Sequence, residues 1–253
     1  MIVALTRDVS PRIAECELTF LERQPIDYAR AAAQHAAYER CLAAHGCRVV
    51  HIEPAPELPD GVFVEDAAVV LDEVAIITRP GAESRRAETA SVARALERYR
   101  PLRRIAAPAT IDGGDVLRAG RTLYTGRSAR TNDDGIEQLR ALIAPDGYEV
   151  IAVDFRGCLH LKSAVTQIDV HTLLCNPKWI DPLPGFEMIA VDPAEPFAAN
   201  ALRLDDSIVL AAEHVRTRAI LERRGYAIEP VATSELLKAE AGVTCCSLMV
   251  EVL

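Results

Sequence analysis

The chain has 253 residues, of which 50% are hydrophobic and 26% are charged, a composition typical of a globular protein. Acidic residues outnumber basic ones by 37 to 28, giving a formal charge of −9, and without a basic stretch this balance argues against nucleic-acid binding. No apolar run could span a membrane, and no signal-peptide pattern is present. Seven cysteines occur without a CxxC pair, which argues against structural zinc and predicts a cytoplasmic protein with reduced thiols.

Short apolar runs alternate with helical stretches along the chain. The runs are rich in valine, isoleucine and leucine and are bounded by glycine, proline or aspartate, which predicts strands. Strands are expected at 2–6, 48–52, 62–71, 74–78, 112–117, 122–125, 148–153, 159–168, 172–175, 187–191, 201–210, 227–230 and 244–252. Helical patterns occupy about 27–45, 84–99, 133–144 and 213–224. Asp27 is a plausible N-cap of the first helix and Gly46 the glycine after its end. No linker interrupts the pattern, so we expect one domain over 1–253.

Reactive polar residues recur at a regular interval in these predicted strands. They are Glu65, Asp112, His160, Asn200 and Cys245, and the successive intervals are 47, 48, 40 and 45 residues. A period of 40–50 residues indicates a propeller or another repeated architecture. Because helices lie between the strands, we expect five α/β modules around a pseudo-symmetry axis, with the reactive residues converging on one central cavity.

Cys245 is the candidate nucleophile. Side chains alternate across a strand, so Cys245 would share a face with the polar Ser247, whereas Cys246 would share one with Leu248. The alternative is that both cysteines are buried as small hydrophobic residues, a common fate of free cysteine.

His160 and Asp112 would complete a catalytic arrangement with this cysteine. The same alternation places His160 and Lys162 on one face of their predicted strand. An imidazole provides a cysteine with a base or a proton donor, and a carboxylate orients the imidazole. Asp112 precedes two glycines, which suggests a close backbone approach. A structural histidine and simple turn chemistry are the alternatives.

Glu65 and Asp66 are adjacent acids inside the apolar string VFVEDAAVV. Buried charges must be paired, and a guanidinium is a natural partner because its donors match a carboxylate. That guanidinium belongs either to an arginine of the chain or to a substrate. Arg85 and Arg130 lie at or just before predicted helix starts, where cations are unfavourable, so each either binds a carboxylate or is a solvated surface residue.

Six strings occur in order along the chain: FVEDAAVV, ITRPGAESRR, IDGGDVL, GRSARTN, LHLKS and VTCCSL. Together they resemble the dimethylarginine dimethylaminohydrolases of the guanidino-group-modifying superfamily, from about Leu5 to Val252. The resemblance implies the pentein fold, a five-bladed, pseudo-symmetric α/β propeller of ββαβ-type modules, as a single catalytic domain. It also implies hydrolysis of Nω-methylated arginine to citrulline and a methylamine through a covalent thiouronium on cysteine, with no cofactor and no metal.

The resemblance assigns roles to ten residues. Cys245 is the nucleophile, His160 the proton donor and Asp112 the carboxylate that orients it. The implied contacts to a small cationic guanidino substrate are Glu65 and Asp66 at the guanidinium, Arg85 and Arg130 at the carboxylate, Asp60 at the amino end, Leu18 in a flexible loop and Ala239 through its backbone. A divalent metal could occupy the Cys245–His160 pair adventitiously and inhibit. The resemblance also implies, loosely, a homodimer.

Two other functions stay open at this point. One is an arginine deiminase or amidinotransferase of the same superfamily, although the deiminases carry an additional helical insertion for which 253 residues leave no room. The other is a guanidino-ligand binding protein that has lost catalysis. The presence of Cys245, His160 and Asp112 argues against that second function.

Overall fold

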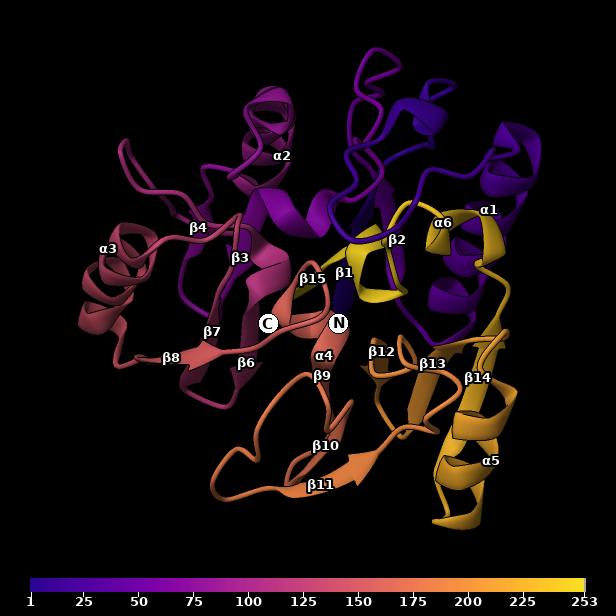
Figure 1. The fold of residues 1–253 in the computed structure, drawn as a ribbon. Coiled ribbons are helices and arrows are strands. Elements are labelled where there is room, and N and C mark those ends of the chain that lie inside the picture. The colour runs from indigo at the N-terminus through magenta and orange to yellow at the C-terminus, as the bar shows by residue number, and fades with distance from the viewer. Residues whose placement is uncertain (253) are drawn as a thin grey trace.

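Short strands pair in threes, and the resulting five sheets of the computed structural model stand around one axis (Figure 1). The structure describes residues 1–252. The sheets are β15-β1-β2, β3-β4-β5, β6-β7-β8, β9-β10-β11 and β12-β13-β14. The strands are β1 Ile2–Thr6, β2 Arg48–His51, β3 Ala68–Val70, β4 Ala75–Ile77, β5 Leu102–Arg104, β6 Val116–Ala119, β7 Thr122–Arg127, β8 Glu149–Asp154, β9 Val165–Asp169, β10 Thr172–Cys175, β11 Glu187–Ala190, β12 Ala201–Leu204, β13 Ser207–Ala211, β14 Ala227–Val231 and β15 Leu248–Glu251.

Every sheet repeats one module. The first strand pairs antiparallel with the second, and the second pairs parallel with the third. A parallel pair needs a crossover connection. Four modules use a helix on the outside of the ring for it (Figure 1): α1 Tyr28–Ala44, α2 Thr89–Leu96, α3 Asp133–Ile143 and α5 Val215–Arg223. The β9-β10-β11 module uses the loop 176–186 instead. The predicted five-module α/β propeller is therefore confirmed, with one module lacking its helix.

Side-chain caps mark the starts of α1 and α3, whereas α2 and α5 begin without one. Asp27 accepts a hydrogen bond from the Arg30 amide at 3.1 Å at the start of α1, and Gly46 beyond its end has a φ of +78°. Asn132 caps α3 by accepting from the amide of Gly135 at 2.8 Å. Each cap satisfies an amide that has no partner inside the helix.

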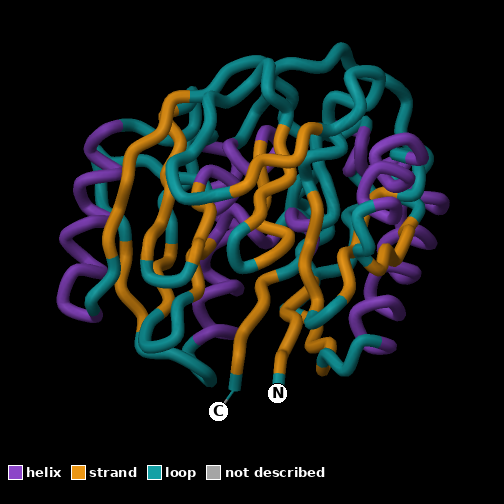
Figure 2. The backbone as a smooth tube through the Cα atoms, turned by 90° about the horizontal axis from the view of Figure 1, so that it is seen from below, coloured by secondary structure: helices purple, strands orange, loops and turns teal. Residues whose placement is uncertain are grey.

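The first sheet closes the ring by joining the two ends of the chain. β1 pairs with β15, and the Val252 amide donates to the Met1 carbonyl at 2.8 Å. Figure 2 shows both termini at the same end of the molecule, with many connecting loops gathered at the opposite end. Within residues 1–252, no helix has the length and apolar character needed to cross a membrane.

The predicted strands that carry the reactive residues are wrong in their first halves. The ranges 62–71, 112–117, 159–168 and 244–252 each contain a short helical turn followed by a shorter strand. These turns are η2 Val64–Ala67, η4 Gly113–Asp115, α4 Leu161–Ala164 and η6 Thr244–Cys246. A short apolar run does not distinguish a buried strand from a buried helical turn. The range 201–210 is likewise a hairpin of two strands, β12 and β13.

The first strands of the five modules line the axis of the ring. They are β3, β6, β9, β12 and β15, and they contribute to the walls of a central cavity of about 360 Å³. The hydrophobic core lies mainly between neighbouring modules in five clusters. Each of the turns η2, η4, α4 and η6 directly precedes one of the axial strands, so these turns meet at the end of the ring opposite the hairpins.

Candidate active site

Most of the predicted residues line one pocket, and three of them, Asp66, His160 and Cys245, lie in or directly before the helical turns that precede the axial strands. Among the ten predicted residues, Leu18, Glu65 and Asp112 do not line it and the other seven do. The lining residues are Glu17, Asp60, Phe63, Asp66, Arg85, Arg130, Leu159, His160, Ala239, Glu240, Ala241 and Cys245.

Cys245 lies in the turn η6, and its sulfur accepts a hydrogen bond from the Gly242 amide at 3.3 Å. Burial, followed by the negative charges of Glu65 and Asp66, raises the pKa of its thiol well above the ordinary value. Cys246 is buried in the core. The alternating-face prediction was wrong for this pair, because both cysteines lie in a helical turn rather than in a strand.

His160 lies between two carboxylates directly before α4. Its Nε2 is 3.1 Å from an oxygen of Asp112, and its Nδ1 is 3.7 Å from an oxygen of Asp66. Burial lowers the pKa of His160, but the charges of Asp66, Asp112 and Asp115 outweigh burial and raise that pKa to about 9. At neutral pH the imidazole is therefore a cation and can donate a proton.

Asp112 sits behind His160, fully buried, and is held in place by other groups. Its carboxylate accepts from the Gly81 amide at 2.9 Å and lies 3.8 Å from Nη1 of Arg130. Nη1 of Arg130 is buried without a hydrogen-bond partner. Arg130 therefore keeps donors for a ligand in the pocket.

Sequence reasoning missed Asp115, a second acid under the site. Its carboxylate accepts hydrogen bonds from Ser128, from Thr131 and from the Leu161 amide. Burial raises the pKa of Asp115 to about 6. The string IDGGD contains both acids, and a second acid directly before an axial strand was the available signal.

The guanidinium of Arg85 donates its hydrogen bonds to groups of the protein, whereas the sequence suggested a ligand carboxylate or solvent. Its guanidinium donates to Asp66 at 2.5 Å, to both oxygens of Glu88, at 3.0 and 2.8 Å, and to the Phe63 carbonyl at 3.0 Å. The pKa of Asp66 is raised by burial but lowered further by His160 and Arg85, so it ends well below its usual range. Glu88, which the sequence did not single out, thus fixes the arginine that holds Asp66.

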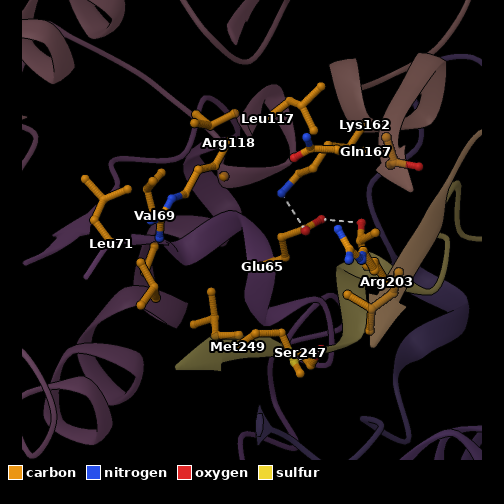
Figure 3. A pocket seen from close by; sticks show the side chains of 18 of the residues that line it. Glu65, Val69, Leu71, Leu117, Arg118, Lys162, Gln167, Arg203, Ser247 and Met249 are labelled. Atoms are coloured by element: carbon orange, nitrogen blue, oxygen red, sulfur yellow. Dashed lines mark hydrogen bonds and ion pairs between the residues drawn. The ribbon is translucent and has the colours of Figure 1, made fainter. Parts of the chain in front are cut away.

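Glu65 does not lie in this pocket. Its carboxylate accepts from Nζ of Lys162 at 2.5 Å and from the hydroxyl of Thr244 at 2.8 Å. Figure 3 shows Glu65 and Lys162 pointing toward each other in the wall of the central cavity. The predicted common face of His160 and Lys162 was wrong as well, because Lys162 lies in the helical turn α4 and not in a strand. Asp66 therefore faces the pocket and Glu65 does not, and the guanidinium-binding role of the two acids stays a prediction.

The remaining predicted residues gather at the mouth of the pocket. Asp60 accepts from the Glu17 amide at 3.1 Å, and burial raises the pKa of Asp60. Ala239 lines the wall. Leu18 is half-buried and packs against the adjacent core cluster rather than into the pocket.

One cluster among residues 1–252 has the composition of a metal site. Atoms of Asp66, Asp112 and His160 lie within 4.8 Å of one another. A metal would need a neutral imidazole, whereas the two carboxylates keep His160 protonated. The imidazolium itself therefore supplies the positive charge that these acids need.

The pocket combines a thiol, a proton donor, carboxylates and a cation with free donors. The carboxylates suit the cationic end of a ligand and Arg130 suits an anionic end. Cys245 then lies in the same pocket as both. This arrangement fits nucleophilic attack on a group carried by an amino-acid-like molecule.

Comparison with known proteins agrees with this geometry. A family model described as N,N dimethylarginine dimethylhydrolase, eukaryotic, matches residues 19–175. The N(G),N(G)-dimethylarginine dimethylaminohydrolase of Streptomyces coelicolor is 43% identical over 246 residues, which cover 97% of this chain and 95% of that protein. The protein of the same name from Pseudomonas aeruginosa is 37% identical over 226 residues, which cover 88% of this chain and 89% of that one. A solved structure of the Pseudomonas aeruginosa protein, a cysteine-to-serine mutant complexed with citrulline, superposes with a TM-score of 0.91 at 34% identity over 97% of this chain and 98% of that one.

Proposed function

The chain belongs to the dimethylarginine dimethylaminohydrolase family, and on that premise we propose that it hydrolyses Nω-methylated arginine to citrulline and dimethylamine or methylamine. The observation that carries the proposal is that Cys245, His160, Asp66 and Arg130 line one pocket. These four supply the nucleophile, the proton donor, the acid for a guanidinium and the cation for a carboxylate.

Asp66 and Arg130 orient the substrate. A guanidinium is delocalised and stays protonated, so its carbon is a poor electrophile until its plane is fixed next to a nucleophile. Asp66 is ionised, and one of its oxygens already accepts from the Gly114 amide at 2.9 Å. Its remaining lone pairs accept the N–H groups of the substrate. Arg130 binds the carboxylate at the other end.

The substrate itself activates the nucleophile. The thiolate is the reactive form of cysteine, and the free pocket disfavours it because Cys245 is buried near Glu65 and Asp66. A bound cation offsets those negative charges and lowers the pKa of the thiol. The thiol loses its proton to solvent as the substrate binds, and the thiolate then attacks the guanidinium carbon to form a tetrahedral adduct.

His160 moves the proton in both halves of the reaction. It donates a proton to the departing methylamine as the carbon–nitrogen bond breaks, which leaves a thiouronium on Cys245. The neutral imidazole then takes a proton from water as the water oxygen bonds to the same carbon. Cleavage of the carbon–sulfur bond releases citrulline and regenerates the thiolate. Asp112 and Asp115 act through His160 as positioning residues.

We also propose that residues 1–253 act as one catalytic domain, since the first sheet contains strands from both ends of the chain. A cytoplasmic location is supported by the absence of any disulfide among the seven cysteines, all of which are in the described part of the chain. The homodimer implied by the resemblance is tested by sedimentation equilibrium of the purified chain.

The test is citrulline release from asymmetric dimethylarginine, monomethylarginine and arginine, with Cys245→Ala and Cys246→Ala as a matched pair. Removal of the nucleophile lowers kcat by at least about 10³-fold. Cys246 lies in the core, so its variant keeps most of the activity. Equal activity of wild type and Cys245→Ala removes Cys245 as the nucleophile. Turnover of arginine alone, without its methylated forms, moves the chain to the deiminases.

A further inference from the structure

Residues 17–26 run past the pocket between β1 and α1 with no regular structure of their own. Among residues 1–252, none of these ten takes part in a backbone–backbone hydrogen bond. Of their side chains, Leu18 and Ile26 pack against the adjacent core cluster, but between them Thr19 is exposed and Phe20 is 51% exposed. Figure 1 shows this indigo segment close to the yellow segment that follows α6 (Ser234–Leu237). Other interactions must therefore hold it in place.

Two buried carboxylates provide those interactions. Asp60 accepts from the Glu17 amide. Glu240 accepts from three consecutive amides, those of Thr19 at 3.1 Å and of Phe20 and Leu21 at 2.5 Å each. Hydrogen bonds to an ionised carboxylate are stronger than those between neutral groups. Glu240 therefore satisfies three amides that have no backbone partner.

The backbone of Glu240 has an unusual conformation at this contact. Its φ is +58°, a left-handed conformation that is uncommon for a residue other than glycine. Glu240 is 9% exposed and sits between Ala239 and Ala241, which also line the pocket. Cys245 follows five residues later in the same pocket wall. The strained residue therefore links residues 17–21 directly to the segment that carries the nucleophile.

Residues 17–21 lie against the pocket, since Glu17 lines it and the hydroxyl of Thr19 accepts from Nη2 of Arg130 at 3.5 Å. The space open to the centre of a water-sized sphere is about 10 Å³, which is room for about one water molecule. A methylated arginine has many more atoms than that space admits. Substrate entry therefore requires the pocket to widen, and Glu17 and Glu240 both lie in its wall.

We propose that Glu240 is a positioning residue that latches residues 17–21 over the pocket and thereby determines how tightly the substrate is retained. Loss of the latch weakens the apparent affinity for the substrate, because only the closed state holds the substrate from all sides. Without the latch, the population of the closed state falls. The kinetic part of this inference rests on the proposed function, whereas the closure itself does not.

The experiment compares Glu240→Ala, Glu240→Gln and Glu22→Ala by amide hydrogen exchange and by steady-state kinetics. Alanine adds no new backbone strain relative to glutamate, since both have a Cβ. Glu22 is exposed on the same segment, which makes it the matched control. In Glu240→Ala the amides of Thr19, Phe20 and Leu21 exchange at least about 10-fold faster, because their opening no longer breaks three hydrogen bonds.

Glu240→Ala also raises KM for asymmetric dimethylarginine by about 10-fold while kcat changes less than about threefold. Glu240→Gln falls between alanine and wild type, since its amide oxygen accepts hydrogen bonds without the charge. Wild-type exchange at 19–21 in Glu240→Ala overturns the latch, and so does equally faster exchange in α3, which would indicate general destabilisation. If the wild type turns over no methylated arginine, the proposed function fails while the exchange result still decides the latch.

Discussion

The charge on His160 is set by an excess of acids around one imidazole. Asp66, Asp112 and Asp115 all act on it, and they outweigh the burial that would otherwise keep the ring neutral. A proton donor must be protonated when the reaction begins, whereas the thiol beside it must be deprotonated by substrate binding. His160 therefore carries the proton before the reaction begins, and the bound substrate lowers the pKa of the Cys245 thiol.

Replacing Asp112 by Asn removes one of these charges and puts a neutral amide in place of the carboxylate that bonds Nε2 at 3.1 Å. We expect the pKa of His160 to fall from about 9 by at least about 1 unit. NMR titration of the histidine ring, assigned with His160→Gln, measures it. An unchanged pKa in Asp112→Asn would assign the shift to the other two acids.

The same shift fixes how His160 contributes to stability. Its pKa is about 9 in the folded state against an ordinary value of 6.5 for histidine, so the stabilisation is fully present below pH 6.5 and is lost as the pH rises through 9. Protonation of His160 contributes about 3 kcal/mol at most to the free energy of unfolding. Urea denaturation of wild type and His160→Gln at pH 6 and pH 9 checks it, since their difference in unfolding free energy should shrink at the higher pH.

At the scale of elements, the unit that builds the site is a short helical turn followed by an axial strand. The turns η2 and η4 pack so closely that a Cβ on Gly113 would lie 2.0 Å from the Glu65 carbonyl oxygen. A Cβ on the next residue, Gly114, would instead meet Nδ1 of His160 at 2.6 Å and an oxygen of Asp66 at 2.7 Å. Gly113 therefore allows two backbone segments to pack closely, whereas Gly114 leaves room for the side chains of His160 and Asp66.

This difference predicts separable effects of two adjacent substitutions. Gly113→Ala drives two backbones apart and destabilises the fold by about 3 kcal/mol. Gly114→Ala displaces catalytic side chains, so it lowers kcat/KM by about 10²-fold or more with a smaller loss of stability. Urea denaturation and citrulline release on both variants test this. Equal losses of stability and activity in the two would contradict the assignment of the two contacts.

These turns also mark the limit of what the sequence predicts. The period of the reactive residues and the helix caps follow from local patterns, and so do the five modules. The direction of Glu65 does not, because a strand would project it on the opposite face from Asp66 whereas a helical turn rotates it toward Lys162. Glu240 was missed because its partners in residues 19–21 lie 219 to 221 residues away. Glu88 was missed because its role depends on Arg85, whose bond to Asp66 spans 19 residues.

For the whole molecule, stability depends on closing the ring. A three-stranded sheet with strands of three to six residues buries too little surface to be stable alone, and the core clusters lie between modules. The pairing of β1 with β15 completes the first module from the two ends of the chain. Because β15 also contacts β3 of the neighbouring module, losing β15 removes more than one strand pair.

A circular permutant tests this view of closure. Linking the two ends with a short flexible linker is geometrically easy, because the Met1 amine lies 3.0 Å from the Val252 carbonyl oxygen. New ends between Pro184 and Gly185 fall in the exposed part of the loop that replaces a helix. Exposed loops of this kind tolerate new termini. We expect the permutant to keep its circular dichroism spectrum and to release citrulline within about threefold of wild type.

The matched control removes β15 instead of moving the ends. Deleting residues 247–252 leaves β1 without its antiparallel partner and uncovers Val3 and Leu5, both fully buried. This variant should lose cooperative unfolding, whereas the permutant, with every module contact restored, should keep it. A cooperatively folded deletion variant would show that four modules suffice and that the ring need not close. An unfolded permutant would instead place an essential connection in the loop 176–186.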